Sequence, residues 1–171
     1  MQFSQKVAIV GNSGSGKSTL AEKIHSQTGA PILQLDNITW DRKQIQKRRE
    51  ISDSLDALKQ FTDSHSPSWI VEGCYGELIE SLFSLRPMLI FLDPGEAVCL
   101  KHCQNRGWER HKYPSKDEQD KYLPFLLSWV SEYYRREGPM SYQFHRALYD
   151  RYSGPKILFD DVALVEALGA R

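Results

Sequence analysis

Short apolar runs and longer amphipathic segments alternate along the chain. Five runs are rich in β-branched, aromatic or other large apolar residues and are bounded by Gly, Pro or Asp; they span 6–10, 31–35, 69–72, 88–92 and 156–159. Runs of this length without polar alternation are typical of strands that are buried on both faces. The pattern therefore predicts five buried strands.

Apolar residues at three- and four-residue steps fill the intervals between these runs. They predict helices over 17–28, 51–61, 78–83, 94–103 and 162–168, and a largely helical stretch over 116–151 that is interrupted near Gly138-Pro139. Asp93-Pro94 has the pattern of a helix N-cap followed by proline at the first helical position. Alternation of strand and helix predicts a parallel sheet with right-handed crossovers and helices on both faces.

Length and composition fit one globular domain over residues 1–171. With 40% hydrophobic and 26% charged residues, the chain is not of a composition typical of disorder. Its 22 basic and 22 acidic side chains cancel, which argues against binding nucleic acid or membrane through bulk positive potential. No secretory leader or spanning segment of about 18 apolar residues is visible, and three cysteines suit a reducing compartment. We therefore expect a cytoplasmic protein.

A glycine-rich motif follows the first predicted strand and opens the first predicted helix. It matches G-x-x-x-x-G-K-[ST] in full, in the strand–loop–helix context that such a motif requires. Glycines let backbone N–H groups converge on anionic oxygens, and the helix N-terminus adds its positive dipole end. Lys17 can reach the β- and γ-phosphates, and Ser18 can offer its hydroxyl to Mg²⁺. The predicted nucleotide-binding residues are Gly11, Asn12, Ser13, Gly14, Ser15, Gly16, Lys17, Ser18 and Thr19.

A phosphate loop at the start of a short, helix-rich chain resembles the adenylate- and shikimate-kinase-like group of P-loop proteins. Three later segments sharpen the resemblance: Leu35-Asp36-Asn37-Ile38-Thr39-Trp40, Trp69-Ile70-Val71-Glu72-Gly73-Cys74-Tyr75 and Leu89-Ile90-Phe91-Leu92-Asp93. Together they are similar to bacterial DNA topology modulation proteins, a kinase-like family of P-loop ATPases. Cys74 stands where that family usually has Asn.

The resemblance implies a three-layer α/β/α P-loop nucleoside triphosphate hydrolase fold with a five-stranded parallel sheet of order 2-3-1-4-5. In that order the third strand lies beside the first, so that Glu72 would face the phosphates and serve the Mg²⁺ site. Asp93 is its rival, with a helix N-cap as the alternative role. Asp36, placed at the end of the second strand, would orient the acceptor and take its proton, or else would cap a turn.

A lid is expected near 106–116, because this kinase group carries one after the helix that follows the fourth strand. Phosphoryl transfer spreads negative charge over the moving group, so arginines that close over it would stabilise it. Arg106 and Arg110 are four residues apart and would share one face if this segment is helical. The alternative is a solvated basic helix end.

Three further clusters have open interpretations. The basic run consists of Arg42, Lys43, Lys47, Arg48 and Arg49, and it is either a solvated face or a site for an anionic acceptor or DNA phosphates. The aromatic-basic stretch consists of Trp129, Tyr133, Tyr134, Arg135 and Arg136, and it belongs either to the core or to an acceptor pocket. The Cys/His group consists of Cys99, His102 and Cys103 on one predicted helix, and its spacing favours core packing over a metal site.

The functional prediction is an ATP- and Mg²⁺-dependent phosphotransferase, a kinase-like enzyme that acts on an unidentified small acceptor. Adenine would lie between the lid and the loop after the last strand, near Asp160-Asp161. The alternative is a slow ATPase that acts as a nucleotide-switched binding protein associated with DNA. Zero net charge and the absence of a DNA-binding motif count against that alternative. A nucleoside monophosphate, a polyol and a macromolecule all remain open as acceptors.

Overall fold

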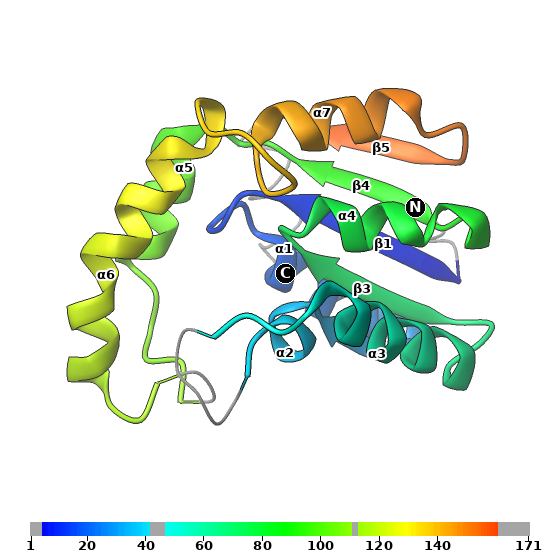
Figure 1. The fold of residues 1–171 in the computed structure, drawn as a ribbon, viewed down its shortest axis with the longest axis horizontal. Coiled ribbons are helices and arrows are strands. Elements are labelled where there is room, and N and C mark those ends of the chain that lie inside the picture. Colours follow the sequence, from blue (N-terminus) through cyan, green and yellow to red (C-terminus); the bar gives the residue numbers. More distant parts are fainter. Residues whose placement is uncertain (1–4, 42–46, 111–112, 161–171) are drawn as a thin grey trace.

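The structure is a computed structural model and describes residues 5–41, 47–110 and 113–160. Its centre is one parallel sheet with the strand order β2-β3-β1-β4-β5, as the resemblance implied (Figure 1). The strands are β1 (Lys6–Gly11), β2 (Ile32–Gln34), β3 (Trp69–Gly73), β4 (Met88–Leu92) and β5 (Lys156–Phe159). All five predicted strands are therefore present.

Helices cover both faces of the sheet. They are α1 (Lys17–Thr28), α2 (Asp36–Thr39), α3 (Ile51–Ser64), α4 (Gly76–Ser81), α5 (Glu96–Gln104), α6 (Lys116–Ser131) and α7 (Tyr142–Arg151), with 3₁₀ turns at Phe83–Leu85 and Glu132–Tyr134. The predicted helix over 162–168 lies outside the described residues. In the described part of the chain, no helix combines the length and the apolar content that crossing a bilayer requires.

The alternation of side chains along β1 creates two separate cores. Val7 and Ile9 point to one face, where they pack with Leu20 and other apolar residues of α1. Ala8 and Val10 point to the opposite face, where they pack with apolar residues of α3, α4 and α7. Because strand side chains alternate with a period of two, a strand buried on both faces needs an unbroken apolar run, which is what residues 7–10 supply.

A third, smaller core joins α5 to α6. Cys99, Cys103 and Val130 are buried together, with Leu100, Leu126 and Leu127 packed around them. The two helices lie side by side beyond the carboxyl ends of the strands (Figure 1). Core packing of the two cysteines is thus confirmed, and within the described ranges no three His, Cys, Asp or Glu side chains cluster as metal ligands would.

The predicted N-cap at Asp93 is wrong. The N-cap of α5 is Gly95, and the helix begins at Glu96, three residues after Asp93. The backbone N–H of Asp93 still pairs with the Phe159 carbonyl at 2.8 Å, and its carboxylate accepts the Tyr134 hydroxyl. These two contacts hold Asp93 at the sheet edge, so the chain turns into the helix only at the following glycine.

Two other boundaries differ from the sequence prediction. β2 ends at Gln34, and Asp36 is the first residue of the short helix α2 rather than the end of a strand. The N-cap of α2 is Leu35, so Asp36 does not cap this helix either. The helix predicted over 78–83 stops at Ser81, where the chain tightens into a 3₁₀ turn.

Candidate functional site

The phosphate loop connects β1 to α1 in the middle of the sheet. Gly14 and Gly16 have φ values of 79° and 94°, in the left-handed region that glycine enters without a steric penalty. Gly16 is also the N-cap of α1, so the loop runs directly into the first turn of that helix. Alternating left- and right-handed residues let successive N–H groups face one concavity, the arrangement that binds phosphate oxygens at a helix N-terminus.

Lys17 places its ammonium group over the loop. Its side chain is only 9% exposed, and Nζ donates a 2.7 Å hydrogen bond to the carbonyl oxygen of Asn12. Asn12 is itself buried, so this contact fixes the cation at the mouth of the loop rather than in solvent. A fixed positive charge beside converging N–H groups favours a polyanion such as a nucleotide triphosphate.

Ser18 and Glu72 bring α1 and β3 into direct contact. The Ser18 hydroxyl donates a 2.8 Å hydrogen bond to Oε1 of Glu72, which is 5% exposed. The pairing of β1 with β3, with Ile9 opposite Glu72, puts this carboxylate beside the loop. A hydroxyl and a carboxylate are hard oxygen donors of the kind that Mg²⁺ takes, so the residues present fit a magnesium ion.

Ser15 gives a second sign that the loop fits an anion. Its hydroxyl oxygen is buried and has no hydrogen-bond partner within the described residues. A buried polar atom without a partner costs free energy unless a ligand or water satisfies it. The loop therefore contains a buried hydroxyl donor that no described residue uses.

Asp93, the rival of Glu72, is held in a different environment. It ends the strand on the opposite side of β1, and Tyr134 donates to its carboxylate. Burial raises the pKa of the Asp93 carboxyl group, which makes it a poorer anionic ligand. Only Glu72 of the two is joined to the phosphate loop by a side-chain contact among those described.

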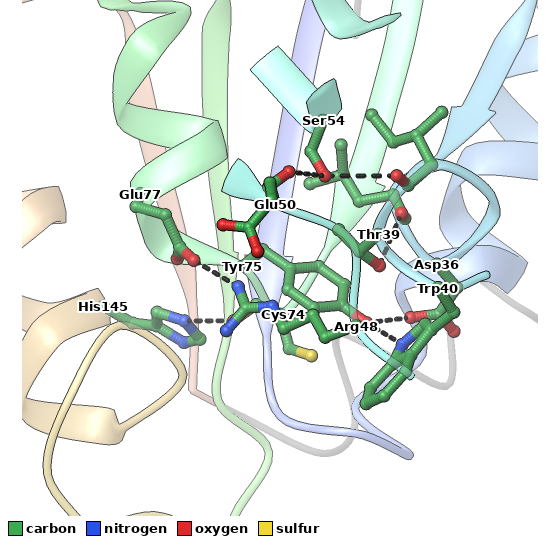
Figure 2. A network of polar contacts seen from close by, with 12 residues as sticks. Asp36, Thr39, Trp40, Arg48, Glu50, Ser54, Cys74, Tyr75, Glu77 and His145 are labelled. Atoms are coloured by element: carbon green, nitrogen blue, oxygen red, sulfur yellow. Dashed lines mark hydrogen bonds and ion pairs between the residues drawn. The ribbon is translucent and has the colours of Figure 1, made fainter. Parts of the chain in front are cut away.

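Asp36 belongs to a chain of three side chains that the sequence did not reveal (Figure 2). The Tyr75 hydroxyl donates a 2.7 Å hydrogen bond to Oδ1 of Asp36 and accepts one of 2.6 Å from the indole N–H of Trp40. Tyr75 is 2% exposed, and burial raises its pKa far above the ordinary value, so the phenol remains a proton donor to the carboxylate. The only sequence signal was an aromatic hydroxyl just after a buried strand.

Arg48 lies over the ring of Tyr75. The guanidinium carbon of Arg48 lies 5.5 Å from the ring centroid, and Arg48 forms an ion pair with Glu77 (Figure 2). Lys47 and Arg49, the neighbours of Arg48 in the basic run, are also described, whereas Arg42 and Lys43 lie outside the described residues. Arg48 therefore has a specific partner and is not simply a solvated cation.

Cys74 shows that several predicted site residues converge. Burial raises the pKa of its thiol to about 11, and the charges of Asp36, Lys17, Arg136 and Glu72 act on it as well. Its backbone carbonyl accepts a 3.0 Å hydrogen bond from Nε2 of His145 (Figure 2). The residue that departs from the Asn of the resembling family thus lies in the middle of the candidate site.

The segment that contains the predicted lid is not helical where its arginines lie. α5 ends at Gln104 and α6 begins at Lys116, so Arg106 and Arg110 do not share a helix face as predicted. Arg106 pairs with Glu109 at 3.3 Å, while the Arg110 guanidinium lies 4.8 Å from the ring centroid of Trp108. Arg106 also interacts electrostatically with Asp36.

Arg136 stabilises the connection between α6 and α7. Its guanidinium lies 3.7 Å from the Trp129 ring centroid and donates to the carbonyls of Trp129 and Met140 at 2.6 and 2.9 Å. Its neighbour Arg135 is exposed. Asp160 is the last described residue, and Asp161, the other residue expected near adenine, lies outside the described residues.

The fold and site define a P-loop nucleotide-binding protein. Residues 1–142 match the family model described as ABC transporter, and the chain belongs to this family of P-loop NTPases. None of the curated proteins matches the sequence.

Two solved structures share the fold. A gluconokinase from Sinorhizobium meliloti 1021 is 19% identical with a TM-score of 0.57, over 99% of this chain and 89% of that one. A sugar kinase from Janibacter sp. HTCC2649 is 19% identical with a TM-score of 0.53, over 95% of this chain and 88% of that one. At this identity the likeness shows a common P-loop kinase-like architecture.

Proposed function

We propose that the protein is an ATP- and Mg²⁺-dependent phosphotransferase that acts on a small acceptor. The observation that carries this proposal is the 2.8 Å contact between Ser18 and Glu72, made from the turn of α1 that also contains Lys17. It joins a hydroxyl to a carboxylate directly after a glycine-rich loop, and with the cation of Lys17 these are the parts needed to bind Mg-ATP.

Each part of the loop has a separate role in the proposal. The backbone from Gly11 to Thr19 holds the phosphates, and Lys17 neutralises charge at the β- and γ-positions. Ser18 and Glu72 would hold the metal ion, directly or through water, and the ion would neutralise charge that develops on the phosphoryl oxygens. No covalent intermediate on the protein is needed, because positioning and electrostatics suffice for phosphoryl transfer.

The acceptor side is assigned to Asp36 and to the two arginines of the lid near 106–116. Asp36 would orient the acceptor hydroxyl and take its proton as the oxygen attacks. Arg106 and Arg110 would close over the transferring group and stabilise its developing negative charge. Closure requires both guanidinium groups to exchange their present partners for phosphate oxygens.

The comparisons support the kinase class without naming the acceptor. The two solved structures described above are named as kinases, one a gluconokinase and one a sugar kinase. This favours a hydroxyl-bearing small molecule for the first tests. The motif resemblance to DNA topology modulation proteins adds duplex DNA as a further candidate, although zero net charge argues against it.

The testing experiment measures ADP production from Mg-ATP with and without a panel of acceptors. The panel holds nucleoside monophosphates, nucleosides, shikimate, gluconate and duplex DNA. We expect one acceptor class to stimulate turnover, and Lys17→Ala to abolish it. Lys121→Ala is the matched control, because Lys121 is 72% exposed and pairs only with Glu118 among the described contacts. Failure of the unmodified protein to bind Mg-ATP would overturn the proposal.

A further inference from the structure

Three residues of α5 that carry potential metal-binding atoms lie directly against the phosphate loop. Cys99, His102 and Cys103 share one helix face through their spacing of three and four. A Cβ atom placed on Gly14 would come within 2.3 Å of the Cys99 carbonyl oxygen and 2.9 Å of the Cys103 sulfur. The backbone of Gly14 therefore rests on this face with no room for a side chain.

His102 makes the polar contact of this packing. Its Nδ1–H donates a 2.8 Å hydrogen bond to the carbonyl oxygen of Gly14, across 88 positions of sequence. Because the peptide group is planar, fixing the direction of this carbonyl fixes the whole Gly14–Ser15 peptide plane. That plane belongs to the turn that leads the chain into Gly16 and Lys17.

The neighbouring helix α6 holds the loop at a second point. The side-chain amide of Asn12 donates a 3.0 Å hydrogen bond to the Val130 carbonyl, and its oxygen accepts the backbone N–H of Ser13 at 2.9 Å. Val130 is buried in the same small core as Cys99 and Cys103. The loop is thus attached at two residues to one packed pair of helices.

A phosphate-binding loop needs such support for a physical reason. When successive N–H groups turn inward toward an anion, some carbonyl groups are left facing outward, and each needs its own partner. Gly14, with φ of 79°, is held in a conformation that other residues rarely adopt. Without a donor for its carbonyl, the turn would lose a contact that keeps it in this conformation.

We propose that His102 is a positioning residue for the phosphate loop, which it holds in its nucleotide-binding conformation through the Gly14 carbonyl. Cys99 and Cys103 supply the close packing against Gly14. The inference rests on the proposed function only in that the loop binds nucleotide phosphates. It also gives this Cys/His pattern a role in packing against the phosphate loop.

The experiment compares Mg-ATP affinity by calorimetric titration for the unmodified protein, His102→Leu, His102→Asn and Gln104→Ala. Asparagine keeps an N–H donor at the same distance from Cβ as Nδ1, whereas leucine keeps only bulk. We expect His102→Leu to weaken Mg-ATP binding about tenfold and His102→Asn to restore it to within about threefold. Gln104 is exposed on the same helix, and its replacement should leave the affinity unchanged.

Unchanged affinity in His102→Leu, or equal weakening in His102→Leu and His102→Asn, would overturn the inference. Lys17→Ala separates this failure from failure of the proposed function. If Lys17→Ala loses Mg-ATP while His102→Leu keeps it, only the positioning role is wrong; if Lys17→Ala binds as tightly as the unmodified protein, the loop does not bind phosphate. Urea unfolding checks each variant, and His102→Phe replaces the leucine variant, with the same criteria, if that one does not fold.

Discussion

The Ser18 hydroxyl donates a 2.8 Å hydrogen bond to the Glu72 carboxylate across 54 positions of sequence. This contact ties the first turn of α1 to the carboxyl-terminal part of β3, on the same side of β1 as the phosphate loop. This contact distinguishes Glu72 from Asp93, whose carboxylate instead accepts a hydrogen bond from the Tyr134 hydroxyl. We therefore assign Glu72, and not Asp93, to the proposed magnesium site.

Glu72→Gln should weaken the binding of Mg²⁺ at the proposed site. The amide keeps the size of the side chain but loses the charge that favours a divalent cation. We expect the Mg²⁺ concentration for half-maximal ADP production to rise about 10- to 100-fold. Asp93→Asn is the matched control, because its side chain lies on the other side of β1 and should leave this concentration unchanged. Equal effects of the two substitutions would contradict the assignment.

Tyr75→Phe should impair the acceptor side while sparing nucleotide binding. The phenylalanine ring preserves the packing under Arg48, but Asp36 loses its 2.7 Å donor. With the acceptor that stimulates turnover, we expect kcat/KM for that acceptor to fall about tenfold and the KM for ATP to stay within about twofold. A parallel loss of ATP affinity would show that Tyr75 serves the fold as a whole and not Asp36.

Arg106→Ala and Arg110→Ala test the lid. Because the arginines are proposed to contact the transferring group, each substitution should lower kcat about a hundredfold and leave Mg-ATP affinity nearly unchanged. Arg146→Ala removes an exposed arginine that pairs with Asp150 and serves as the control. Single-turnover measurements of ADP formation would give these rates. Rates unaffected by both lid substitutions would contradict a lid role for this segment.

His145 predicts a specific dependence of stability on pH. Burial lowers its pKa from 6.5 to about 4, because its ring lies inside the core between Tyr133 and the Cys74 carbonyl. Below pH 6.5 the unfolded chain binds a proton that the folded chain does not bind. The contribution of His145 to the free energy of unfolding should therefore fall as the pH drops toward 4, by about 3 kcal/mol in all.

Urea unfolding at several pH values between 7 and 4 measures this effect. His145→Gln should be less stable at pH 7, because it cannot make both hydrogen bonds of the imidazole, but its stability should fall less steeply over the same range. If the two proteins show the same slope, the pKa of His145 is not lowered in the folded state, and His145 does not contribute to the acid sensitivity.

The sequence predicted the architecture well because the strands carry their own signal. An unbroken apolar run such as 88–92 marks a strand buried on both faces, and the glycine-rich loop fixes the junction of β1 and α1. The strand order came from the family resemblance. That order predicts Glu72 beside the loop, and the sheet has that order.

Contacts between residues that are far apart in the sequence could not be predicted in this way. Tyr75 and Asp36 are 39 positions apart, and His102 and Gly14 are 88 apart, with no spacing rule to connect them. Asp93 was misassigned for the same reason. Local rules favoured a helix cap, whereas a tyrosine 41 residues later supplied a competing hydrogen bond.

The most direct test of the proposed phosphotransferase follows the phosphorus atom itself. Mg-ATP is incubated with the protein and each acceptor of the panel, and the products are observed by ³¹P nuclear magnetic resonance. We predict a new phosphorylated product, a phosphate ester from a hydroxyl acceptor or a diphosphate from a nucleoside monophosphate, that forms with ADP in a one-to-one ratio of transfer events with one acceptor class and is missing in Lys17→Ala. Release of inorganic phosphate alone, at a rate that no acceptor changes, would contradict the phosphotransferase and favour a slow ATPase.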